Sequence, residues 1–88
     1  MNYRTVLVDD EPLALKRLSR LLQAFPGVVI VGEAGTVADA VAVTEREQPD
    51  LLFLDIQLPD GEGFDVLHRI EDRPLAPLVI FTTGYDQY

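Results

Sequence analysis

Four short runs of apolar residues, separated by longer segments of mixed polarity, dominate the pattern of this chain. Each run is apolar at nearly every position, which is typical of strands buried on both faces in a parallel sheet. Turn-forming or acidic residues follow each run. We therefore predict strands over Tyr3–Val8, Val28–Val31, Leu51–Asp55 and Leu78–Phe81.

The segments between these runs carry apolar residues at helical spacing, with charged residues on the opposite side. The first begins after an acidic stretch with a proline at its first turn and ends at Pro26-Gly27. The second opens with Thr36 and Asp39, spaced like a capping box, and is stopped by Pro49. The predicted helices are Pro12–Phe25, Val37–Glu47 and Gly63–Asp72, with loops at Gly32–Gly35 and Ile56–Glu62.

The resulting order, βαβαβαβ, indicates parallel strands joined by right-handed crossovers. Too few α/β units are present for a closed barrel. We therefore expect a flavodoxin-like, doubly wound parallel sheet in which the first strand lies beside the third and the fourth strand is outermost.

The outermost predicted strand, Leu78–Phe81, is apolar at every position, although apolar strands belong inside sheets. An exposed apolar edge favours pairing with another chain. The helix Pro12–Phe25 also has a wider apolar stripe than one sheet face would cover. We expect either a fragment of a larger domain or a homo-oligomer formed by strand pairing or domain swapping.

Composition narrows the possible functions. The chain of 88 residues fits one domain, and its fifteen acidic against seven basic residues give a formal net charge of −8. This charge argues against contact with nucleic acid and suits a divalent cation or a basic partner. The chain has no cysteine, and its single histidine, His68, excludes a histidine metal cluster. No apolar run is long enough to cross a bilayer and no signal peptide is recognisable, so a cytoplasmic location is expected.

Two of the predicted strands end in aspartate: Asp9 and Asp10 follow the first, and Asp55 closes the third. Parallel strands that lie side by side bring these carboxylates to the same edge, where open α/β sheets bind ligands. Asp10 alone could simply cap the helix that follows, with the others solvated. Three carboxylates together repel one another unless a cation lies between them, and oxygen ligands are those that Mg²⁺ prefers.

Other groups follow the same strand ends. The backbone carbonyl of Gln57 could face the same cation, and Pro59 would stiffen that loop. Thr82 and Thr83 could donate hydroxyl hydrogen bonds to a bound anion, although threonine is also simply a good strand former.

Three segments, Val8–Ala14 (VDDEPLA), Leu54–Gly61 (LDIQLPDG) and Phe81–Asp86 (FTTGYD), together closely resemble response-regulator receiver domains of two-component signalling. The opening VDDEPLA and the ending FTTGYDQY are most similar to receivers of LytTR-type (LytR/AlgR) transcription regulators. The resemblance runs along the whole chain in the correct order and spacing. It identifies residues 1–88 as the N-terminal portion of such a domain.

The resemblance implies specific roles. Asp55 would be the phosphoacceptor, Asp9 and Asp10 would form the acidic pocket, and Asp10, Asp55 and the Gln57 carbonyl would hold Mg²⁺. Thr83 would supply the switch hydroxyl. A sensor histidine kinase would be the phosphoryl donor, a transcription-regulating output domain would receive the signal, and the chain itself would not be an enzyme.

The family's fifth strand, the lysine that ends it and the last two helices have no counterpart in the sequence, and Lys16 is wrongly placed to replace that lysine. One alternative is therefore a receiver-like interaction or oligomerisation fragment without phosphotransfer. A second is a small Mg²⁺-dependent phosphate enzyme, which is disfavoured because no general acid or base accompanies the carboxylates.

Overall fold

The computed structural model describes residues 1–74 and 76–82. Its main sheet has four parallel strands in the order β2-β1-β3-β6, so the first strand lies between the second and third and β6 is at the edge. This is the flavodoxin-like topology that the sequence predicts. The strands are β1 (Tyr3–Val8), β2 (Val28–Ala34), β3 (Leu51–Asp55) and β6 (Leu78–Thr82).

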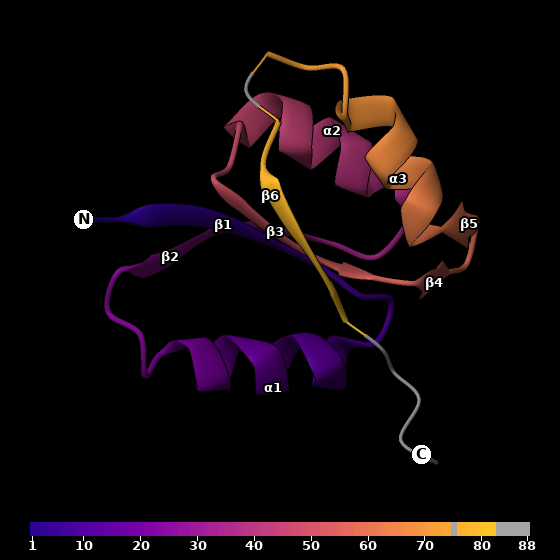
Figure 1. Ribbon diagram of the computed structural model, residues 1–88. Helices are drawn as coiled ribbons and strands as arrows, with labels where there is room; N and C mark the ends of the chain where they lie inside the picture. Colours follow the sequence, from indigo (N-terminus) through magenta and orange to yellow (C-terminus); the bar gives the residue numbers. More distant parts are fainter. Residues whose placement is uncertain (75, 83–88) are drawn as a thin grey trace.

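Helices cover the two faces of the sheet unequally. Helix α1 (Pro12–Leu22) lies alone on one face, whereas α2 (Val37–Glu47) and α3 (Gly63–Ile70) lie together on the other (Figure 1). Because side chains alternate along a strand, each strand contributes residues to both faces. The main core lies between the sheet and the α2/α3 pair; its buried members include Val6, Val8, Leu52, Leu54, Ala40, Val43, Val66 and Ile70.

Two helices end earlier than the sequence predicts. Helix α1 stops at Leu22 instead of Phe25, because Ala24 and Phe25 donate hydrogen bonds to carbonyls three residues back, as in a tightened turn. Helix α3 ends at Ile70, two residues before the predicted Asp72. Apolar spacing continues past the end of α1 to Phe25, so the pattern alone could not locate that end, whereas the residues between Ile70 and Pro74 are charged and give no apolar signal.

Strand β2 is longer than expected, and the predicted loop at residues 32–35 is wrong for its first three positions. Residues 32–34 continue the pairing with β1 after a register shift between Thr5 and Val6. Gly32 is required here by close packing, since a Cβ atom at this position would lie 2.6 Å from Val43 Cγ2 of α2. A glycine that suggests a turn in the sequence instead lets a helix approach a strand.

The predicted loop at residues 56–62 contains a small antiparallel hairpin. Strand β4 (Gln57–Leu58) pairs with β5 (Gly61–Glu62), and this hairpin projects beyond the end of β3 next to α3 (Figure 1). Its start lies only two residues after Asp55. The hairpin therefore forms part of the surroundings of the acidic strand ends.

Candidate acidic metal and phosphoryl site

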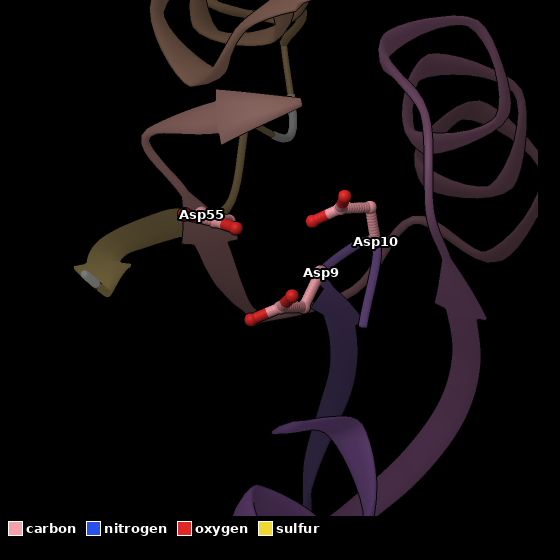
Figure 2. A group of neighbouring side chains, drawn as sticks. All are labelled: Asp9, Asp10 and Asp55. Atoms are coloured by element: carbon pink, nitrogen blue, oxygen red, sulfur yellow. The ribbon is translucent and has the colours of Figure 1, made fainter. Parts of the chain in front are cut away.

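The three aspartates that the sequence singles out lie together at the carboxyl edge of the sheet. Asp9 and Asp10 follow β1 and Asp55 ends the neighbouring β3, and Figure 2 shows their carboxylates around a shared space. One oxygen from each lies within 4.8 Å of the others. The adjacent parallel strands bring these residues together.

Local hydrogen bonds distinguish the three carboxylates. Asp9 accepts a hydrogen bond from the backbone N–H of Glu11 at 2.9 Å. Glu11, not Asp10, is the N-cap residue of α1, and no side-chain hydrogen bond caps that helix. The simple alternative that Asp10 caps the helix is therefore wrong. The exposed side chain of Asp10 instead points toward the space beside Asp55 (Figure 2).

Asp55 is the most buried of the three, with 7% of its surface exposed. Burial is the main cause that raises the pKa of Asp55 above its usual value, and the negative charges of Asp9 and Asp10 raise it further. A hydrogen bond from the N–H of Gln57, at 3.3 Å, partly opposes this shift. The site thus holds a carboxylate in an environment that disfavours its charged form unless a cation compensates.

The backbone packs closely behind Asp55. A Cβ atom at Gly63 would clash with the Asp55 carbonyl oxygen and would come within 3.2 Å of Leu54 and Phe81 side-chain atoms. The N–H of Gly63 also donates to the Ile56 carbonyl at 2.7 Å. Gly63 therefore lets α3 begin directly against the end of β3. From the sequence alone, Gly63 is predicted only as the start of a helix.

The donor set fits a hard cation. Mg²⁺ binds oxygen ligands at about 2.1 Å, so ligands on opposite sides of the ion lie about 4.2 Å apart. The spread of 4.8 Å in the cluster exceeds this only slightly. A side-chain movement of about half an ångström, or a water between one carboxylate and the ion, would complete such a site.

The other predicted site residues are not part of the carboxylate cluster itself. Gln57 begins β4 and its backbone N–H contacts Asp55, while its side chain is exposed. Thr82 pairs with Asp55 in the register of β3 and β6. Thr83, the predicted switch residue, lies outside the described residues. His68 is exposed on α3, where its ring contacts the carboxylate of Glu71.

Asp60 makes a contact that the sequence pattern does not predict. The carboxylate of Asp60, at the tip of the β4–β5 hairpin, accepts hydrogen bonds from Val37 and Ala38 at the start of α2. Its Pro-Asp-Gly context predicts a turn and gives no sign of a partner more than twenty residues earlier in the chain.

Among the described residues, no helix is both long and apolar enough to span a bilayer.

Comparisons with known proteins agree with this geometry. The chain is 47% identical over 83 residues to the sensory transduction protein LytT of Enterococcus faecalis, covering 94% of this chain and 34% of the relative. It is 42% identical over 87 residues to an uncharacterized response regulatory protein of Vibrio cholerae, covering 98% and 33% respectively. The chain thus spans about a third of the length of the curated relatives it matches.

Solved structures share the fold. The crystal structure of a LuxR-family two-component response regulator from Aurantimonas sp. superposes with a TM-score of 0.88 at 27% identity, covering 97% of this chain and 61% of the other. The model of the response regulator receiver domain family matches residues 5–88. With the parallel sheet and the three aspartates at its carboxyl edge, this match shows that the chain belongs to the response regulator receiver domain family.

Proposed function

We propose that Asp55 is the phosphoacceptor of this receiver domain and that Asp9 and Asp10 form the acidic pocket beside it. The observation that carries this proposal is the convergence of the three carboxylates within 4.8 Å at the end of the central strands. A sensor histidine kinase is the proposed donor, and an output domain that regulates transcription is the proposed recipient of the signal. The proposed location is the cytoplasm.

In the transfer step, a carboxylate oxygen of Asp55 attacks the phosphorus atom of a phosphohistidine. A P–O bond to Asp55 forms as the P–N bond to the histidine breaks, and the released imidazole nitrogen takes up a proton. Asp10, Asp55 and the Gln57 carbonyl would hold Mg²⁺, with Asp9 adjacent. When bound, the ion would neutralise charge on the transferring group.

Phosphorylation adds about −1.5 to −2 charges at the sheet edge. The hydroxyl of Thr83 is the proposed switch donor to the phosphoryl oxygens. The protein would act as a stoichiometric phosphoacceptor and not as an enzyme with repeated turnover. The phosphorylated and unphosphorylated forms would then differ in the surfaces they present to partners.

Incubation with Mg²⁺ and acetyl phosphate tests this function. We expect the mass of the intact chain to increase by one phosphoryl group, and beryllofluoride to shift amide resonances around Asp55. Asp55→Asn should abolish both effects. Asp50→Asn is the matched control. Asp50 immediately precedes β3, at the end opposite to Asp55, and its carboxylate accepts a hydrogen bond from the N–H of Arg4. Unchanged labelling of the Asp55→Asn variant would exclude Asp55 as the acceptor, and repeated hydrolysis of acetyl phosphate would favour the enzyme alternative.

We also propose that the chain associates with a second copy through the edge of β6. This edge strand has no neighbour on its outer side among the described strands, and Leu78 and Ile80 are exposed. A free apolar edge favours pairing with another strand. Light scattering should show a dimer whose population falls in Ile80→Lys, whereas Leu21→Lys on exposed α1 should leave it unchanged. A stable monomer at high concentration would contradict the proposal.

A further inference from the structure

We propose that Asp60 is a positioning residue for the acidic pocket. Its carboxylate connects the β4–β5 hairpin, which begins two residues after Asp55, to the N-terminus of α2. This inference rests on the proposed function, because the group that it positions is the Asp55–Gln57 segment. Asp60 itself is not a member of the carboxylate cluster.

The contact is a two-oxygen bridge. One carboxylate oxygen of Asp60 accepts from the N–H of Val37 at 2.6 Å, and the other accepts from the N–H of Ala38 at 3.2 Å. The next N–H, that of Asp39, is already bonded to the side chain of Thr36 at 3.0 Å. The start of α2 thus uses its own cap for one donor and the hairpin for two others. A negative charge is also favoured at this end of a helix.

The hairpin depends on contacts with its surroundings, which include the burial of Leu58 in the core and a hydrogen bond from the N–H of Glu62 to Asp65 as well as the Asp60 bridge. It consists of only two residue pairs, Gln57 with Glu62 and Leu58 with Gly61, and so short a ribbon has little stability of its own. Its tip is held closely against its neighbours. Gly61 adopts φ 157°, and a Cβ atom there would lie 2.7 Å from an Asp65 oxygen and 3.2 Å from a Val37 methyl group.

The position of the hairpin determines two features of the pocket. The N–H of Gln57 donates to the carboxylate of Asp55, and the carbonyl of Gln57 is the proposed backbone ligand of Mg²⁺. A shift of the hairpin tip would therefore move both groups relative to Asp9 and Asp10. Because the Asp60 bridge holds that tip against α2, its loss should loosen the pocket without removing any ligand.

The alternative is that Asp60 only caps α2. Hydrogen bonds from Val37 and Ala38 keep the pKa of Asp60 below its usual value, which agrees with either role. Thr36→Ala provides a matched control, because it removes a cap from the same helix end without touching the hairpin. A purely structural role predicts the same behaviour for Asp60→Ala and Thr36→Ala, whereas a positioning role predicts that only Asp60→Ala changes the pocket.

The decisive experiment measures Mg²⁺ affinity by NMR titration and the rate of labelling by acetyl phosphate for the protein and both variants. We expect Asp60→Ala to weaken Mg²⁺ binding about tenfold and to slow labelling, as loss of supporting contacts does at other metal sites. Thr36→Ala should change the affinity less than about twofold despite a similar drop in Tm. Asp60→Asn, which keeps one acceptor oxygen, should be intermediate. Equal affinities in Asp60→Ala and Thr36→Ala would overturn the inference.

A measurement without metal separates this inference from the proposed function. Amide exchange of Gln57 and Glu62 in metal-free protein should be faster in Asp60→Ala than in Thr36→Ala. If the unmodified protein neither binds Mg²⁺ nor is labelled, the proposed function fails, and the exchange comparison still tests whether Asp60 holds the hairpin. Equal exchange in the two variants would show that the hairpin is held without it.

Discussion

The two faces of the sheet differ in how completely they are covered, although the same strands supply both. On the face under α2 and α3, Leu52 and Leu54 of β3 are fully buried among helix side chains. On the face under α1, the adjacent Phe53 is only partly buried, and Ile80 of β6, which shares its register, is exposed. Leu7 of the central strand β1, which pairs with Phe53, is nevertheless fully buried, so the α1 face is covered at its centre and open toward β6.

Helix α1 shows the same contrast from the other side. It buries Leu22 against the sheet, but Leu21 remains 68% exposed and Leu13 58% exposed. Two helices lie over the α2/α3 face, whereas α1 alone lies over the other (Figure 1). We infer that most of the folding free energy of this chain comes from the α2/α3 face.

The largest expected effect comes from a substitution in the core on the α2/α3 face. Leu54→Ala should lower the free energy of unfolding by about 3 kcal/mol, because it leaves a cavity among fully buried neighbours. Phe53→Ala, one residue earlier on the less covered face, should cost less despite removing a larger side chain. Urea unfolding measures both values. A greater loss for Phe53→Ala would show that the α1 face carries the stability instead.

A methyl group added to the well-packed face should have the next largest effect. Gly32→Ala would place a Cβ atom 2.6 Å from Val43 Cγ2 and should cost about 1–3 kcal/mol through overpacking. Gly35→Ala is the control: its nearest contacts, at 3.5 Å to the Asp9 carbonyl and 3.6 Å to the Asp10 Cα, are ordinary van der Waals distances. Thermal unfolding of the two variants compares them, and equal Tm values would show that β2 and α2 can separate at no cost.

Much of this architecture could be predicted from local patterns. Apolar runs, helical spacing and the Pro/Gly boundaries identified the four strands of the main sheet and their order, because right-handed crossovers leave few arrangements. The β4–β5 hairpin was missed because strands of two residues show no periodicity. The continuation of β2 past Gly32 was missed because its cause is a contact with α2, which is distant in sequence.

The features of the candidate site likewise divide into those that the sequence predicts and those that it does not. Asp9, Asp10 and Asp55 could be expected to meet, because the ends of adjacent parallel strands share an edge. The close approach at Gly63 and the bridge from Asp60 to α2 could not be expected, because each joins side chains or backbone from separate elements. Sequence patterns thus predicted which groups converge but not what holds them in place.

The stability of the protein should depend on pH in a direction set by Asp55 at the carboxyl edge of the sheet. Burial and the neighbouring carboxylates raise the pKa of Asp55 in the folded protein, so the folded state retains its proton to higher pH than the unfolded state. Stability therefore falls as pH rises from the usual aspartate pKa through the raised one. Asp55→Asn removes that loss of stability.

We expect the Asp55→Asn variant to melt a few degrees above the unmodified protein at pH 7 without Mg²⁺. The difference should vanish as the pH falls to the usual aspartate pKa. Asp60→Asn is a control of opposite sign, because hydrogen bonds lower the pKa of Asp60 and its stabilisation is lost as the pH falls. A lower Tm for Asp55→Asn at pH 7 would contradict the electrostatic account of the pocket.

The smallest expected effect concerns a flaw in the well-covered face. Thr44 of α2 is 5% exposed, and its hydroxyl oxygen has no hydrogen-bond partner within residues 1–74 and 76–82. Thr44→Val keeps the side-chain shape and removes this unpaired group, so it should stabilise the fold by about 0.5 kcal/mol. Thr36→Val on the same helix should instead cost about 1 kcal/mol, since the Thr36 oxygen accepts from the N–H of Asp39. Denaturant unfolding of both variants measures these two changes in the free energy of unfolding, which should have opposite signs. Destabilisation by Thr44→Val would mean that the Thr44 hydroxyl is hydrogen-bonded in solution, so that this face buries no unpaired hydroxyl at Thr44.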